Sequence, residues 1–200
     1  MMTPLIILKR LFVVLVLIGM VSSCGSSSKK VRFYRLTVSP SESNTDTSLI
    51  KPKAEVRVTV NLADFLNQTG IVTQLGPNEL TSAHYHLWSE SLQQAVQQQM
   101  IQLLNQNQEG ILFNALNGTI DSTQKYQLFI KFNNFQGSDK GTVLSSGQYR
   151  LYHQKNLIIN HTFYFNEPVS GDGYNAVIQQ LQQSLVHLSS EIALELKKIN

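Results

Sequence analysis

Charged side chains are scarce in this sequence of 200 residues, because Asp, Glu, Lys and Arg together make up 14% of it, against about a quarter in a typical soluble domain. Nucleic-acid binding needs dense lysine and arginine, so this composition argues against nucleic acid as a partner. The single cysteine, Cys24, excludes an intramolecular disulfide, a cysteine-rich zinc site and a CxxC redox pair. The chain also lacks a second long apolar run, which excludes a polytopic membrane protein. The hydrophobic fraction, 42%, is ordinary and suffices for the core of one domain.

The N-terminal segment has the pattern of a secretory signal. Two basic residues, Lys9 and Arg10, precede an apolar stretch over residues 11–20, and small residues then lead to Cys24. The stretch is too short for a comfortable transmembrane helix, which needs about 20 residues. A lone cysteine at this position resembles a bacterial lipobox. We therefore predict a lipoprotein signal peptide over residues 1–23 and lipidation of Cys24; the alternatives are a plain signal peptide beside an unrelated cysteine and an uncleaved anchor.

The residues after the predicted cleavage site indicate where the lipoprotein is sorted. Gly25 follows Cys24, whereas an Asp at this position retains enterobacterial lipoproteins at the inner membrane. We predict that acyl chains on Cys24, palmitate among them, anchor the protein to the periplasmic face of the outer membrane of a Gram-negative bacterium, since stable anchoring takes more than one chain. Residues 24–30 form a Ser-rich lipidated tether, and the folded domain is expected over residues 31–200.

Alternation of apolar and polar residues predicts the strands of this domain. Residues 54–62 alternate cleanly, as a half-buried strand does. The sequence Gly76-Pro77-Asn78 is a strong turn signal, so residues 71–75 and 79–83 are expected to pair as a hairpin. Further strands are expected over residues 31–38, 111–116, 124–135, 142–153 and 157–165. We expect the last four of these to form an antiparallel meander.

Two segments switch to the helical period. Residues 85–104 place an apolar residue at every third or fourth position, with Trp88 on that face and glutamines on the other. Residues 174–199 carry a similar stripe and end with lysines that suit the helix dipole. The predicted fold class is therefore α+β: a single domain with a largely antiparallel or mixed sheet and two long helices packed on one face.

The sequence offers little support for catalysis or for a metal site. His84 and His86 are two residues apart and would share a face in a strand, but no third ligand stands at a useful spacing. The other histidines, His153, His161 and His187, are isolated in the sequence. Nucleophile elbows and phosphate-binding glycine loops are absent. We expect no catalytic residue, no metal and no cofactor, so that the protein is not an enzyme.

Aromatic residues leave two interpretations open. Trp88, the single tryptophan, is expected in the core rather than at a ligand. A set of aromatic side chains could line a lipid-binding groove, although alternating strands more often bury such residues. The members of this set are Tyr85, Phe129, Phe163 and Tyr164. If Phe129, Phe135 and the side of residues 158–164 are exposed, they mark a surface for a partner or a lipid.

Three segments resemble one protein family. Residues 71–80 followed by residues 85–92, YHLWSESL, resemble its signature, in which a strand with R-x-G-x-N precedes R-W-A-E-P-L. Residues 126–135 resemble its Y-x-L-x-V strand, and residues 174–193 resemble its last helix. The family is that of the ABC-type transport auxiliary lipoproteins, which includes the paraquat-inducible protein C lipoproteins. The match covers roughly residues 31–199.

The sequence departs from the family pattern at three positions of this signature. Leu87 stands where the family often has Arg, Gln74 where a basic residue is common, and Ser91 where Pro is common. These departures weaken the idea that the step before Trp88 is a binding feature in this chain.

The resemblance implies a role that the residues alone do not show. Lipoproteins of this family work beside mammalian-cell-entry-domain periplasmic proteins and their inner-membrane transporter partners, in moving phospholipids between the two membranes. By this resemblance the protein would dock such a partner at the outer membrane, and a ring-shaped homo-oligomer would match the symmetry of a tunnel end. The alternative is a structural or assembly adaptor lipoprotein that binds an envelope protein without handling lipid. The residues that bind a partner or a lipid are not identified by the sequence.

Overall fold

The computed structural model describes residues 29–37, 52–107, 110–115 and 126–197. These residues form eight strands, one short 3-10 helix and two long helices, all in a unit that begins at Val31. The elements in chain order are β1 (Arg32–Tyr34), β2 (Ala54–Leu62), the 3-10 helix η2 (Asp64–Leu66), β3 (Gly70–Gln74), β4 (Leu80–Trp88), α2 (Leu92–Asn107), β5 (Ile111–Asn114), β6 (Tyr126–Ser138), β7 (Thr142–His153), β8 (Asn156–Pro168) and α3 (Gly173–Lys197).

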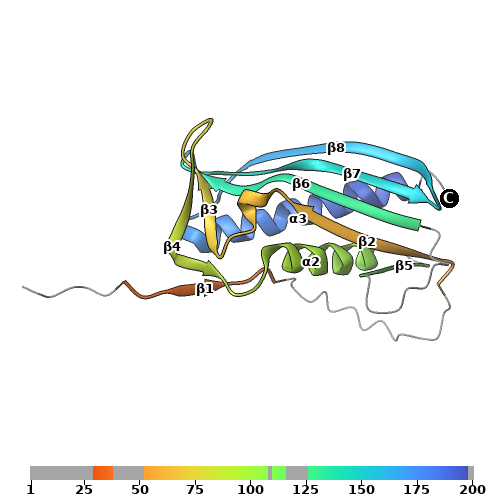
Figure 1. Ribbon diagram of the computed structural model, residues 1–200, viewed down its shortest axis with the longest axis horizontal. Coiled ribbons are helices and arrows are strands. Elements are labelled where there is room, and N and C mark those ends of the chain that lie inside the picture. The colour runs from red at the N-terminus through yellow and green to blue at the C-terminus, as the bar shows by residue number, and fades with distance from the viewer. Residues whose placement is uncertain (1–28, 38–51, 108–109, 116–125, 198–200) are drawn as a thin grey trace, which may run out of the picture. The chain divides into compact units, whose positions relative to one another are not determined.

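The strands make one mixed sheet centred on β6 (Figure 1). One edge of β6 pairs with β7, and β7 pairs with β8; both pairings are antiparallel. The other edge of β6 pairs in parallel first with β2 and then, near its end, with β3. Beyond these, β5 adds to β2 and β4 to β3, and β1 lies outermost beside β4. The 3-10 helix η2 leads from β2 toward β3.

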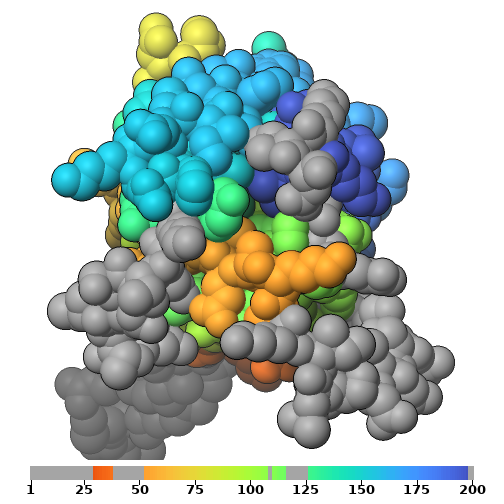
Figure 2. Space-filling model, turned by 90° about the vertical axis from the view of Figure 1, so that its right-hand side faces the viewer, coloured from red at the N-terminus to blue at the C-terminus, as the bar shows by residue number. Residues whose placement is uncertain are grey.

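Both helices cover the same face of this sheet (Figure 1). The second helix, α2, packs over β2 and β5, whereas α3 packs over β6, β7 and β8, and the two helices also contact each other. At the end where β2 begins, β7 and β8 lie against α3 (Figure 2). The residues that face this layer are almost completely buried because the alternation of each strand points every second side chain toward the helices. They include Val58, Val60, Leu128, Ile130, Val96, Met100, Leu185, Leu188 and Ile192. The predicted α+β domain, with a mixed sheet and two long helices on one face, is confirmed.

A bulge in β6 reverses the alternation along this strand. The register with β7 shifts between Phe132 and Asn134, so that one extra residue lies on the β6 side. Phe132 and Phe135 consequently face the same side, with their ring centroids 5.4 Å apart. Phe135 is therefore buried, with an exposed fraction of 2%, and it does not contribute to the exposed surface considered from the sequence.

Side chains from α2 satisfy backbone groups at the edge of the sheet. Asn105 brackets Phe113 of β5, accepting from its N–H and donating to its carbonyl at 2.9 Å each. Gln97 accepts a hydrogen bond of 3.1 Å from the N–H of Val60, beyond the point where β5 ends. Such capping protects an edge that could otherwise pair with another chain.

Three expectations from the sequence are corrected. The helix expected over residues 85–104 begins at Leu92, because residues 85–88 complete β4 between β1 and β3. The strand β5 does not belong to a meander with β6, since it pairs in parallel with β2. The first strand extends only over Arg32–Tyr34. The meander of β6, β7 and β8, and the hairpin of β3 and β4, are as predicted.

Candidate functional site

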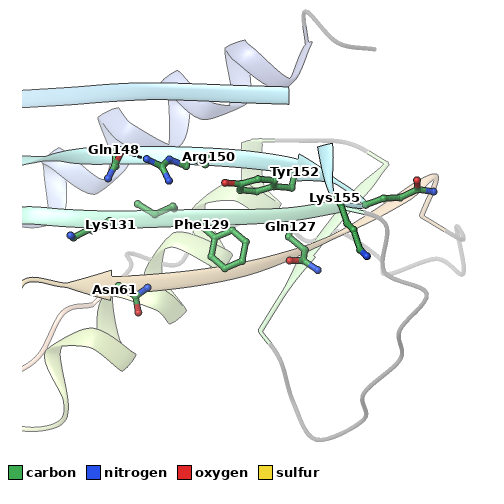
Figure 3. Close-up of a pocket in the computed structure, with 10 residues that line it drawn as sticks. Asn61, Gln127, Phe129, Lys131, Gln148, Arg150, Tyr152 and Lys155 are labelled. Carbon is green, nitrogen blue, oxygen red and sulfur yellow. Dashed lines mark hydrogen bonds between the residues drawn. The ribbon is translucent and has the colours of Figure 1, made fainter. Parts of the chain in front are cut away.

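The face of the sheet opposite the helices carries a shallow trough of about 530 Å³ (Figure 3). We call it the open-face trough. It is lined by Asn61, Gln127, Phe129, Ile130, Lys131, Gln148, Arg150, Tyr152, Gln154 and Lys155. Except for Ile130, whose side chain belongs to the core, these residues come from the outward positions of β2, β6 and β7 and from the β7–β8 turn. The sheet register brings them together: Phe129 stands opposite Arg150, and Lys131 opposite Gln148.

The trough carries positive charge. Lys131, Arg150 and Lys155 line it and are exposed, and no acidic residue is among the ten that form it. The guanidinium of Arg150 is oriented by neutral groups, since its Nη2 donates to Gln148 at 3.0 Å and its Nε donates to Asn160 at 3.2 Å. Amide oxygens fix the direction of the side chain without neutralising it. The trough therefore presents an oriented cation beside two exposed lysines.

An aromatic pair supplies the apolar part of the trough. The rings of Phe129 and Tyr152 meet edge to face, with their centroids 5.8 Å apart (Figure 3). Phe129 keeps 37% of its surface exposed although it lies in the middle of a strand. The exposed ring of Phe129 thus gives the trough an apolar part beside its cations.

The aromatic groove expected from the sequence is only partly assembled. Phe129 and Tyr164 do lie on the open face, and Tyr164 is 68% exposed. Phe163 pairs with Gly147 and points toward the helix-covered face of the sheet, where it is only 4% exposed. The prediction that Phe163 could line a groove is therefore wrong. Tyr85 is exposed but belongs to β4, in another part of the sheet.

Four of the five histidines contact other side chains of the domain. His84 and His86 share a face because both lie in β4, yet only His86 is packed: its ring stacks on Tyr174 at 4.1 Å and its Nδ1 bonds the Tyr34 hydroxyl at 2.8 Å. His153 stacks on Tyr126 with a centroid distance of 4.5 Å. Among the described residues, no group of three or more metal-ligating side chains converges.

Two more histidines connect β8 to α3. Nδ1 of His187 donates to Glu167 at 2.8 Å, and Nε2 of His161 lies 3.9 Å from a carboxylate oxygen of Glu195. Each contact is a full ion pair only when the imidazole is protonated. Both histidine side chains are about half exposed, so these pairs are modest stabilisers of the last helix.

Tyr149 of β7 is fully buried where β7 packs against α3. Its hydroxyl donates to Glu191 at 3.2 Å. Burial raises the pKa of Tyr149 well above its ordinary value of 10.0, and the negative charges of Glu191 and Glu195 add to this effect. The hydroxyl therefore stays protonated and acts as a fixed donor, which is a structural role.

Trp88 lies in the core, as expected, although on a strand rather than a helix. Its exposed fraction is 6%, and its backbone N–H donates to the carbonyl of Thr69 at 2.7 Å. It pairs with Tyr34 across the β1–β4 ladder. The single tryptophan of the sequence thus contributes to the packing of the core.

Cys24 lies outside the described residues, as does the whole of residues 1–23. The signal peptide, the tether over residues 24–30 and the lipidation of Cys24 therefore remain predictions. In the part of the chain that the structure describes, no helix is both long and apolar enough to cross a membrane.

The cationic members of the open-face trough were not identified by sequence reasoning. Lys131, Arg150 and Lys155 are isolated in the sequence and become neighbours only through the register of β6 with β7. The available signal was weak: Lys131 and Arg150 stand at polar positions of two strands predicted to be adjacent. Their alignment across the strands depends on the β6 bulge, which the alternation of the sequence does not reveal.

Comparison with known proteins agrees with the resemblance noted in the sequence. The Intermembrane transport lipoprotein PqiC of Escherichia coli (strain K12) is 25% identical over 179 residues, which cover 89% of this chain and 92% of that protein. The fold matches a crystal structure of an uncharacterized protein with a TM-score of 0.71 at 23% identity, over 84% of this chain and 99% of that chain. It also matches protein XCC0632 from Xanthomonas campestris with a TM-score of 0.60 at 17% identity, over 82% and 93% of the two chains. A family model described as an ABC-type transport auxiliary lipoprotein component matches residues 34–193. The chain belongs to the family of ABC-type transport auxiliary lipoprotein components.

Proposed function

We propose that this protein is a lipid-anchored periplasmic accessory subunit of a system that moves phospholipids between the inner and outer membranes, and that it docks a mammalian-cell-entry-domain protein at the outer membrane. The observation that carries the proposal is the family match over residues 34–193, together with the similarity to an intermembrane transport lipoprotein over most of both chains. In this role the protein acts by binding and not by catalysis.

The architecture suits a docking subunit. The space between the sheet and the two helices is filled by large apolar side chains, so the core leaves the outer surfaces to bind a partner or a lipid. Acylated Cys24 would confine the domain to a thin layer at the membrane. Confinement raises the effective concentration for a partner that reaches this layer, so an interface of modest area is sufficient.

Affinity purification from solubilised envelopes, combined with membrane fractionation, tests this proposal. The expected result is that the lipidated chain sediments with the outer membrane and copurifies with a mammalian-cell-entry-domain protein. Copurification with envelope assembly factors alone would instead support the adaptor alternative, in which the protein binds an envelope partner without handling lipid. Residence in the inner membrane alone would contradict the predicted sorting by Gly25.

A further inference from the structure

The open-face trough combines three features that the fold does not require. Its cations have no acidic partner among the residues that line it, Phe129 of its aromatic pair is exposed, and no helix of the described residues covers the sheet at this place (Figures 1 and 3). Lysines and an arginine on a solvated sheet could serve solubility alone, but exposed Phe129 next to oriented Arg150 does not.

The size of the trough favours a small ligand over a protein surface. A volume of about 530 Å³ falls within the range of sites that take small molecules, about 300–1,000 Å³. A stable protein interface would instead need about 800 Å² of matched surface on each partner. The trough is a local hollow between outward side chains of β2, β6 and β7.

The charges of the trough select an anion. Arg150 uses two of its five N–H donors on Gln148 and Asn160, so three donors are not engaged by described residues. A planar guanidinium held in one direction matches the geometry of a phosphate, which it can bind through two parallel hydrogen bonds. Lys131 lies on the neighbouring strand β6, two residues beyond Phe129, which is the residue opposite Arg150. It adds a second positive charge to the trough.

The aromatic pair selects the rest of the ligand. Phe129 and Tyr152 lie within the same trough as these cations, and Tyr152 has a polar hydroxyl at the end of an apolar ring. Amphipathic aromatics beside Lys and Arg are the combination found at the level of lipid headgroups, where phosphates meet glycerol and the first acyl carbons. A free phosphate would use the cations but would leave Phe129 in water.

We propose that the open-face trough binds the headgroup of an anionic phospholipid, with its phosphate on Arg150 and Lys131 and its glycerol and first acyl carbons against Phe129 and Tyr152. This inference rests on the proposed function, because it names the lipid class that the accessory subunit contacts. The acyl chains extend away from the sheet, so the protein handles the headgroup of a lipid whose tails stay in a membrane or in a partner.

Native mass spectrometry of the lipidated chain in nonionic detergent tests the assignment. The probes are equimolar phosphatidylglycerol and phosphatidylcholine, and in separate samples inorganic phosphate and an oligoglutamate peptide. We expect phosphatidylglycerol adducts to exceed phosphatidylcholine adducts about tenfold. Both lipids carry the phosphate, but only phosphatidylcholine adds a positively charged choline, which the cations of the trough repel. The variant Arg150→Glu should lower phosphatidylglycerol binding at least about tenfold. Lys140→Glu makes the same charge change in the exposed β6–β7 turn and should leave this binding unchanged.

A second variant separates the lipid from other anions. Phe129→Ser should weaken phosphatidylglycerol binding while the weaker binding of inorganic phosphate stays as in the wild type. Equal binding of the two phospholipids, or equal losses for Arg150→Glu and Lys140→Glu at unchanged circular dichroism, would overturn the inference. Stronger binding of oligoglutamate than of phosphatidylglycerol would overturn it too, in favour of an acidic protein partner. If the wild type fails to bind phospholipid but still copurifies with a mammalian-cell-entry-domain protein, this inference fails while the proposed function stands.

Discussion

Replacement of Gly147 by alanine tests the packing at the centre of the sheet. Gly147 lies in β7 between Phe132 of β6 and Phe163 of β8. A Cβ at this position would stand 1.9 Å from the carbonyl oxygen of Lys131 and 3.0 Å from Cζ of Phe163. An ordinary contact between carbon and a carbonyl oxygen is about 3.3 Å, so the backbones of β6 and β7 would have to move apart by more than an ångström. Both strands are hydrogen-bonded on each side, and the movement would therefore strain two ladders.

The expected destabilisation follows from this geometry. Extra carbon atoms in a packed site cost about 1–3 kcal/mol, and we expect about 3 kcal/mol here because the obstacle is backbone rather than a flexible side chain. For a domain of this size each kcal/mol lowers the melting temperature by about 2–4 °C, so Gly147→Ala should melt roughly 6–12 °C below the wild type. Thermal unfolding followed by circular dichroism measures this shift. Gly76→Ala is the control, because a Cβ there meets nothing within 4 Å. Equal melting temperatures for the two variants would refute the close approach of β6 and β7 at Gly147.

Three other perturbations have defined outcomes. Trp88→Ala should lower the free energy of unfolding by about 3–5 kcal/mol, as loss of a buried aromatic side chain does; unchanged stability with loss of partner binding would make Trp88 a contact residue. Because the pKa of Tyr149 is raised in the folded state from its ordinary 10.0, the unfolded chain loses this proton first, and stability should fall as the pH rises above 10. Tyr149→Phe should flatten that fall in alkaline unfolding curves, whereas the same change at exposed Tyr164 should not; identical curves for the two variants would contradict the burial argument. Cys24→Ser should abolish palmitate labelling and leave unprocessed precursor, and labelling that persists would refute the lipobox.

Several elements could be predicted from the sequence because local chemistry determines them. The bounds of β2 and of β7 agree with the predicted strands over residues 54–62 and 142–153, since strict alternation marks β2 and turn residues flank β7 on both sides. The last helix, α3, was predicted to within two residues of its ends because its apolar stripe is long and uninterrupted by proline or glycine after its first residue.

The helix predicted from residue 85 is wrong in its first turns, because the sequence around Trp88 fits both the period of a strand and the period of a helix. Tyr85, Trp88 and Leu92 are spaced as on a helix, and nothing local prevents a helix from starting early. Pairing with β1 and β3 decides the outcome: Trp88 aligns with Tyr34, and Leu87 with Gly70. Contacts between segments far apart in the chain override the local preference.

The candidate site could not be predicted because it depends on register. A shift of one residue between β6 and β7 would turn Arg150 away from Phe129 and toward the helices. The bulge near Phe132 sets how the two strands align, and it has no signature in the sequence. The sequence therefore predicts the layers and the family, whereas the open-face trough becomes visible only in the structure.

Chemical cross-linking in intact cells, followed by membrane fractionation and mass spectrometry, tests the central claim most directly. The account predicts that the lipidated chain is cross-linked to a mammalian-cell-entry-domain protein in the outer-membrane fraction, and that Cys24→Ser loses this cross-link because the domain is no longer held at the membrane. Cross-links to unrelated assembly factors alone, or an unchanged cross-link in Cys24→Ser, would contradict it.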